Sequence, residues 1–283
     1  MTLNLTQALE MGLTAQPDNW QEDVLHVTDL AAAIGETCPR QLQLRLKGAD
    51  RRLPPPGQQM MFRHGQRIHE DLVTLLEAGL PRDWQIWDVE MAVEVASITG
   101  RIDCIIEHIP SGDKFIVDFK TIRGRAFNWL EGPKPAHVLQ VQSYMVAFEQ
   151  STGIKPVEAY VLYVDREGQN SFKQFAVGHD KNRVLDAVVQ TQAIANSPLC
   201  PELQPKIEVK ENKGPDSVKL KQPWNCDYCD YQDVSCHGAL PKKLRDLGIV
   251  GYTYVDGFTP KDGVPAEAVK IVEGLLELEK IPF

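Results

Sequence analysis

The sequence predicts a mixed α/β fold in which helices flank one central sheet. Three observations lead to this prediction: a long helical pattern comes first, three strand patterns follow it directly, and a helix, a strand pair and a helix come next. In a parallel, doubly wound sheet, a helix crosses over between successive strands. Because no helical pattern separates the three consecutive strands, the sequence favours a mixed sheet.

The N-terminal part of the chain is predominantly helical in pattern. Thr28 is a favourable N-cap for a short helix from Asp29, and residues 39–47 indicate a second helix. The run Pro54-Pro55-Pro56-Gly57 then interrupts the chain, and a longer helix is predicted over residues 58–78. One face of this longer helix carries Phe62, Gly65, His69, Leu72, Val73 and Leu76. We expect Gly65, one turn before His69, to allow a close backbone approach.

Alternation of apolar and polar residues indicates the strands. The first three patterns cover residues 89–96, 101–107 and 114–119, with Ser111-Gly112-Asp113 as the turn between the second and third. Further strands are predicted over 157–164 and 171–177, between helices over 136–150, ended by Gly153, and 180–196, capped by Asp180.

The chain divides into four expected regions. An N-terminal helical segment covers residues 1–57, the α/β core covers 58–200, a loop followed by a cysteine cluster covers 201–238, and a C-terminal tail covers 239–283. Residues 201–223 are rich in Lys, Glu and Pro and predict a loop or poorly ordered insertion. Helical patterns in the tail cover 241–247 and 266–280.

The composition excludes several classes of protein. Hydrophobic residues form 43% and charged residues 24% of the chain, which excludes collagenous and wholly disordered proteins. No apolar run approaches the length of a membrane span and the N-terminus lacks a signal pattern, so we expect a cytoplasmic protein without membrane contact. The net charge of −9 argues against a general affinity for nucleic acid. It does not exclude a local basic groove, although a solvated helix face and a loop would also explain the basic stretch, which contains Arg40, Arg45, Lys47, Arg51, Arg52, Arg63 and Arg67.

Charged residues in two neighbouring strands predict a cation site. Asp118 and Lys120 point to the same face of their strand because side chains alternate, and Asp103 lies on the neighbouring strand of the hairpin. Two carboxylates beside a lysine suit a divalent cation and a reacting anion, although a buried ion pair alone would also explain them. His69 on the long helix is a possible ligand or a core histidine. The stripe His137, Gln140 and Tyr144 follows the same strand and can face its polar edge.

These residues resemble the motifs of a known family. Gly65-x-x-x-His69, Gly100-Arg101-Ile102-Asp103, Asp118-x-Lys120 and Gln140-x-x-x-Tyr144 are similar, in order and spacing, to the motifs of PD-(D/E)XK nucleases of the RecB type. The resemblance covers about residues 58–178 and implies a restriction-endonuclease-like core. It implies that Asp103, Asp118, His69 and the carbonyl of Phe119 hold Mg²⁺ or Mn²⁺.

The same resemblance implies roles for the remaining site residues. Lys120 would orient the attacking water and stabilise the transition state, while Gln140 and Tyr144 would fix the DNA backbone or the lysine head group. Arg123 and Arg125 would bind neighbouring phosphates. The aromatic candidates for base stacking are Trp129, Trp224 and Tyr228, for each of which a core or rim role is the alternative.

Four of the six cysteines resemble a cluster motif. Cys38, followed by Cys226, Cys229 and Cys236, is similar to the 4Fe–4S ligand arrangement of AddB and of the CRISPR-adaptation exonucleases of the Cas-four type. Such a cluster would join the N- and C-terminal segments. A structural Zn²⁺ held by the same cysteines, or by the last three with His237, is the alternative. Cys104 and Cys200 are interpreted as a core thiol and an incidental thiol.

The function expected from this resemblance is a metal-dependent DNA exonuclease, acting above all on single-stranded ends. Recombination, repair, phage replication and CRISPR adaptation are the expected processes, with a homo-oligomer or proteins of those pathways as partners. The alternative is a catalytically idle DNA-binding or assembly module of a recombination complex. The presence of Asp103, Asp118 and Lys120 favours the enzyme.

Overall fold

The computed structural model describes residues 9, 11, 12, 23–168, 172–202, 206–209, 218–221, 224–227, 229–232 and 234–236. The chain divides into two compact units. The larger unit contains the residues up to 47 and residues 54–198, and the smaller contains residues 48–53 and those after 198. The predicted tail over 239–283, with its two helices, lies outside the described residues. No helix in the described part of the chain is long and apolar enough to cross a membrane.

The larger unit follows the predicted order of helices and strands. Its helices are the 3-10 helix η1 (Val27–Ala32), α2 (Pro39–Leu46), α3 (Pro56–Gly79), α4 (Gly124–Asn128), α5 (Pro135–Thr152) and α6 (Lys181–Asn196). Its strands are β1 (Trp84–Val95), β2 (Ile98–His108), β3 (Asp113–Ile122), β4 (Glu158–Asp165) and β5 (Phe172–Val177). As predicted, α5 ends at Gly153, which has a φ of 73°, and Asp180 caps α6 by accepting from the backbone N–H of Arg183.

The sheet is mixed, as the sequence predicts. Within the described residues it has five strands in the order β1-β2-β3-β4-β5. The β3–β4 pair is parallel, and the other three neighbouring pairs are antiparallel. The parallel pair needs a crossover connection, which α5 supplies.

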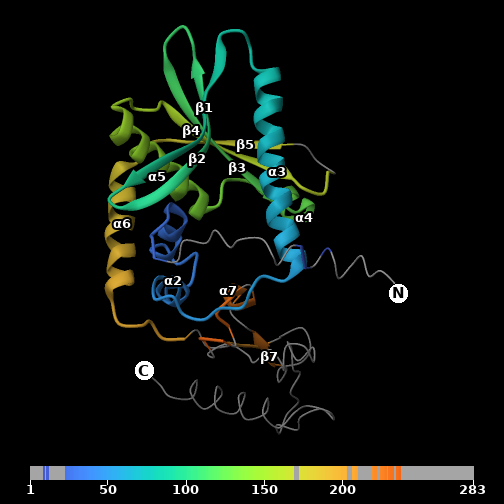
Figure 1. The fold of residues 1–283 in the computed structure, drawn as a ribbon, viewed down its shortest axis with the longest axis vertical. Helices are drawn as coiled ribbons and strands as arrows, with labels where there is room; N and C mark the ends of the chain where they lie inside the picture. The colour runs from blue at the N-terminus through green and yellow to red at the C-terminus, as the bar shows by residue number, and fades with distance from the viewer. Residues whose placement is uncertain are drawn as a thin grey trace. The chain divides into compact units, whose positions relative to one another are not determined.

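Helices cover both faces of this sheet (Figure 1). On one face, α5 packs over a core that includes Ile102, Ile116 and Tyr163. On the other face, α3 contributes Leu72, which packs with Val117 and Phe119. The side chains of β3 therefore alternate between the two cores, and Asp118 and Lys120 fall on the face that α5 covers.

Strands β2 and β3 diverge along their length. Their ladder runs from His108↔Asp113 to Cys104↔Val117 and ends there. Beyond this point β2 continues to pair with β1 as far as Ile98, while β3 continues to pair with β4 as far as Ile122. The two strands thus form a fork that is closed at the 108–113 turn and opens at Asp103 and Asp118.

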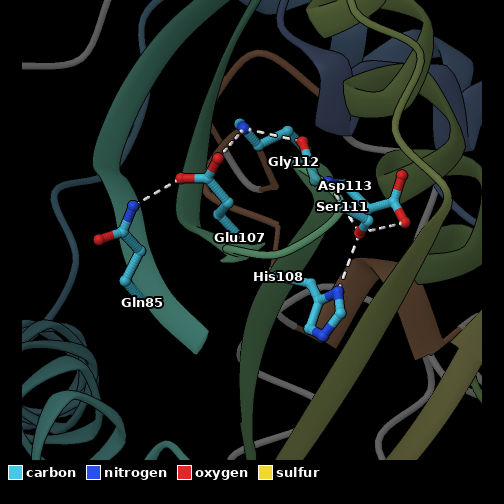
Figure 2. A network of polar contacts seen from close by, with 7 residues as sticks. Gln85, Glu107, His108, Ser111, Gly112 and Asp113 are labelled. Atoms are coloured by element: carbon cyan, nitrogen blue, oxygen red, sulfur yellow. Dashed lines mark hydrogen bonds and ion pairs between the residues drawn. The ribbon is translucent and has the colours of Figure 1, made fainter. Parts of the chain in front are cut away.

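Polar contacts secure the closed end of the fork, as Figure 2 shows. Glu107 accepts hydrogen bonds from Gln85 Nε2, at 2.6 Å, and from Lys114 Nζ, at 2.7 Å. Ser111 Oγ lies 2.8 Å from His108 Nδ1 and donates to Asp113 Oδ2, at 2.6 Å. These contacts hold the predicted turn and fix the register in which the two strands start.

The structure corrects several local predictions. Strand β1 begins at Trp84 rather than at residue 89, because a bulge near Asp88 breaks its alternation. Strand β2 begins at Ile98 after a two-residue turn, Ala96–Ser97, in which both residues have positive φ. The short helix near residue 29 is a 3-10 helix capped at His26, whose backbone N–H donates to Asp29, so Thr28 is not the cap. The helix α4 was not predicted.

The smaller unit contains more regular structure than the sequence predicts. Strands β6 (Lys206–Val209) and β7 (Val218–Lys221) pair antiparallel within the region expected to be a loop. A short helix, α7 (Trp224–Asp227), contains Cys226 and precedes Cys229 and Cys236. The segment 48–53 joins this unit through hydrogen bonds from Arg52 N to Asp230 O, at 2.8 Å, and from Ser235 Oγ to Asp50 O, at 2.6 Å.

Candidate active site at the opening between β2 and β3

A buried ion pair lies on β3 where the fork opens. The ammonium of Lys120 is 3.0 Å from Oδ1 and 2.8 Å from Oδ2 of Asp118, and the carboxylate is 1% exposed. The two residues share a face of the strand, as the alternation predicts. Lys120 is less deeply buried than its partner, so its ammonium is the more accessible of the two groups.

Asp103 bridges the open side of the fork. Its Oδ2 accepts a hydrogen bond of 2.7 Å from the backbone N–H of Phe119, which replaces the ladder bonds that end at Cys104. His69 on α3 lies against the same group, with its Nδ1 3.6 Å from Asp103 Oδ2 and its ring edge-on to that of Phe119. The structure therefore brings His69, Asp103 and Phe119 together.

The ionised forms of the two carboxylates are only partly stabilised by their protein neighbours. Burial raises the pKa of Asp103 and of Asp118, and the nearby Lys120 only partly offsets this effect. Burial and the charge of Lys120 lower the pKa of His69, which keeps its imidazole neutral. Two such carboxylates beside a neutral imidazole are a donor set that fits a divalent cation.

The predicted ligands do not form a complete coordination group as they lie. Among the described residues, no three His, Cys, Asp or Glu side chains are grouped so as to hold a metal ion. In the structure, Asp103 faces His69, whereas Asp118 is paired with Lys120. Coordination by His69, Asp103, Asp118 and Phe119 remains a prediction.

Gln140 and Tyr144 lie on the face of α5 that covers the site. Gln140 Nε2 donates to Tyr144 Oη at 2.9 Å, and both side chains are buried. Burial, and next the charge of Asp118, raise the pKa of Tyr144, so its hydroxyl stays protonated. These contacts join the two residues of the predicted helical motif to each other.

The close backbone approach is at Gly100 and not at Gly65. A Cβ on Gly65 would meet no atom within 4 Å, so the predicted role of Gly65 in packing is wrong. A Cβ on Gly100 would lie 2.8 Å from Tyr144 Cε1 and 2.8 Å from Val27 Cγ2. Gly100 therefore lets the Tyr144 ring lie directly on β2.

The sequence did not predict the contact between His137 and Tyr163 beside the site. His137 Nδ1 is 2.7 Å from the hydroxyl of Tyr163, which also accepts from the backbone N–H of Lys134. Burial, with Lys120 and Lys134 nearby, lowers the pKa of His137 to about 3. Tyr163 is the register partner of Lys120 across the parallel pair. The alternation of β4 could have identified this tyrosine.

The basic and aromatic candidates have different environments. Arg45 is buried and forms an ion pair with Asp29, so it is a structural residue. Arg123 and Arg125 are exposed after β3, and the Arg125 guanidinium lies 5.3 Å from the ring of Trp129. Trp129 is 73% exposed, which excludes a core role. Tyr228 and the side chain of Trp224 lie outside the described part of the chain.

The cysteines fall in both units. Cys38 precedes α2 in the larger unit, whereas Cys226, Cys229 and Cys236 belong to the smaller. The backbone N–H of Cys229 donates to Cys226 O at 3.3 Å, so a tight turn links these two residues. Burial raises the pKa of Cys104 to about 12, which agrees with its interpretation as a core thiol.

The chain is similar to known nucleases. The family model of the PD-(D/E)XK nuclease superfamily matches residues 19–237. Among solved structures, the protein SSO0001 is 18% identical, with 83% of this chain and 95% of that chain covered and a TM-score of 0.46. No curated protein matches the chain.

Two exonuclease structures are also similar. The alkaline exonuclease of Laribacter hongkongensis is 11% identical, with 66% of this chain and 90% of that chain covered and a TM-score of 0.42. A phage-related exonuclease from Haemophilus somnus is 15% identical, with 62% of this chain and 93% of that chain covered and a TM-score of 0.42.

Proposed function

We propose that this chain, which belongs to the PD-(D/E)XK nuclease superfamily, is a metal-dependent DNA exonuclease. One observation carries the proposal: Asp103 and the Asp118–Lys120 pair lie where β2 and β3 diverge, with His69 beside Asp103. Buried carboxylates with raised pKa values are typical of sites that bind a cation or move a proton.

In the proposed mechanism, Asp103 and Asp118 hold Mg²⁺ or Mn²⁺, with His69 and the Phe119 carbonyl as further ligands. When bound, this ion supplies Lewis acidity at the scissile phosphate and makes water a better nucleophile. Lys120 presents its ammonium, oriented by Asp118, where negative charge builds on the phosphate. Tyr144, held by Gln140, contributes a protonated hydroxyl at the same face.

We infer that the substrate is DNA with single-stranded ends. Exposed groups beside the catalytic strand support this proposal: Arg123 carries a positive charge, and Trp129 offers an open aromatic face next to Arg125. Single strands bind by phosphate contacts and base stacking, which these groups can supply. We place the enzyme in DNA recombination or repair, phage replication or CRISPR adaptation.

We further propose that Cys38, Cys226, Cys229 and Cys236 hold a 4Fe–4S cluster. The spacing of the last three and the low exposure of Cys226 and Cys229 support this proposal. Four thiolates are the usual donors of such a cluster. The cluster would join the N- and C-terminal segments and take no part in phosphodiester hydrolysis.

Linear and circular single-stranded DNA separate the proposed activities. With Mn²⁺ or Mg²⁺, the purified protein should release nucleotides from end-labelled linear strands, leave closed circles intact, and lose this activity in Asp118→Asn. Cleavage of the circles would show an endonuclease. Binding of DNA without cleavage, with either metal, would support the alternative of a catalytically idle module.

A further inference from the structure

An arginine-lined pocket adjoins the candidate active site. It has a volume of about 1000 Å³ and lies between α3, the end of β3 and the loop after β4. Its lining includes Ile68 and Thr121, which are the sequence neighbours of His69 and Lys120. A molecule bound in this pocket would therefore lie next to the candidate active site.

The pocket is positively charged, although the chain is acidic. Four arginines, contributed by three different elements, line it against two glutamates, whereas the whole chain has a net charge of −9. The arginines are Arg63, Arg67, Arg123 and Arg166. Arg63 and Arg67 are exposed and four residues apart on α3, a spacing at which like charges repel. A chain of phosphates would bind several of the four guanidinium groups at once.

The pocket also has an apolar part that a phosphate would not use. Met60 and Met61 line it and are 39% and 43% exposed. The sulfur of Met61 lies 3.7 Å from the guanidinium of Arg166, so apolar and cationic groups meet across the pocket. Methionine sulfur makes favourable contacts with aromatic rings. In a duplex the faces of the bases are stacked inside the helix, whereas in a single strand they are accessible.

We propose that this pocket binds one unpaired DNA strand next to the cleaved bond, with its phosphates on the four arginines and its bases against Met60 and Met61. The inference rests on the proposed nuclease function on single-stranded DNA and adds the path that the strand takes and the residues that bind it. The strand replaces the contact between Arg166 and Met61 and runs along α3 toward His69.

The arginines are tested by binding without cleavage. Fluorescence anisotropy of a labelled oligothymidylate, measured in EDTA over a range of salt concentrations, compares wild type with Arg63→Gln/Arg67→Gln. Each phosphate contact on a single strand contributes about 0.7 to the magnitude of the slope of log K against log salt concentration. The slope of the double variant should therefore be smaller in magnitude by about 1.4. Arg82→Gln, an exposed arginine outside the pocket, is the control. A double variant with wild-type affinity and slope overturns the proposal.

The methionines are tested with a strand that has no bases. Met60→Gln/Met61→Gln should bind the oligothymidylate about two- to tenfold more weakly and should bind an abasic strand of equal length as wild type does. Leu75→Gln, an exposed residue of α3 outside the pocket, is the control. An equal loss on both strands, or tighter binding of duplex than of single strand, overturns the assignment of unpaired bases.

The two proposals fail in different ways. If wild type cleaves DNA but neither double variant changes binding, only the pocket assignment is wrong. If wild type binds no DNA and cleaves none with either metal, the proposed nuclease function is wrong as well.

Discussion

Gly100 and Tyr144 are packed so closely that a single methyl group on the glycine would lie 2.8 Å from the tyrosine ring. The contact joins β2, which carries Asp103, to α5, which carries Gln140. Val27 on η1 crowds the same position from another side. Gly100 therefore determines how closely the helix that covers the site can approach the strand.

Gly100→Ala should consequently destabilise the protein and lower nuclease activity. Overpacking a filled site costs about 1–3 kcal/mol of unfolding free energy, and the added methyl group would displace the ring of Tyr144, a residue of the predicted helical motif. Chemical denaturation and initial rates measure the two effects. Gly65→Ala is the matched control for stability, because its Cβ would meet nothing and alanine favours a helix by up to about 1 kcal/mol. Equal stability of the two variants would contradict the assignment.

Lys120 and Lys114 offer a test of the catalytic role against a structural one. Each is a largely buried lysine of β3 paired with a carboxylate, but only Lys120 lies at the opening of the fork. We expect Lys120→Ala to abolish cleavage while its circular dichroism spectrum stays native. Lys114→Ala should lower the melting temperature and keep the activity of the folded fraction. Loss of activity in both variants, or in neither, would remove Lys120 from the mechanism.

The raised pKa of Asp103 predicts how stability depends on pH. Burial raises its pKa from 3.8 to about 6, so the folded state binds more protons than the unfolded state between these values. The free energy of unfolding contributed by this group therefore falls as the pH rises through that window. As the pH rises through this window, the melting temperature of the metal-free Asp103→Asn variant should increase relative to that of the metal-free wild type. Asp186→Asn, an exposed aspartate of α6, is the control, and parallel curves for Asp103→Asn and wild type would refute the prediction.

His69 should affect the metal requirement more than the maximal rate. Its pKa is lowered by burial and by Lys120, so it is neutral, and available to a cation, at every pH above its ordinary value of 6.5. His69→Ala should need roughly ten- to a hundredfold more Mn²⁺ for half-maximal cleavage. His108→Ala, at the closed end of the fork, should behave as wild type. An unchanged Mn²⁺ titration in His69→Ala would leave His69 with its packing role against Phe119.

Metal analysis of cysteine variants tests the proposed cluster. Anaerobically purified wild type should contain about four iron and four sulfide per chain, as expected for a 4Fe–4S cluster. Serine at position 38, 226, 229 or 236 should remove the colour and lower the melting temperature. Cys104→Ser and Cys200→Ser should keep full iron. About one zinc per chain without sulfide would support the structural zinc site instead, and neither metal would exclude both.

Much of the fold was predictable because local patterns and tertiary packing agree. The alternation of β3 correctly placed Asp118 and Lys120 on one face, and Asp180 and Gly153 marked the ends of helices. The turn at Ala96–Ser97 was not predictable, because both residues adopt the positive φ that such turns usually assign to Asn or Gly.

The details of the site depend on contacts that sequence spacing does not encode. Gly65 and Gly100 look equally suited to a close approach, and only the packing of Tyr144 and Val27 distinguishes them. The sequence places Asp103 on the strand next to Asp118. It does not reveal that β2 and β3 separate there and that the Asp103 carboxylate takes the place of a backbone acceptor.

The hydrogen bond from the Phe119 amide to Asp103 makes this main-chain proton sensitive to the ionisation of the Asp103 carboxylate. An ionised carboxylate accepts a stronger and shorter hydrogen bond than a neutral acid. The chemical shift of the Phe119 amide in a nuclear magnetic resonance spectrum should therefore follow the ionisation of Asp103. This single resonance can be recorded in the absence of DNA and of turnover, so the carboxylate can be titrated in the resting protein.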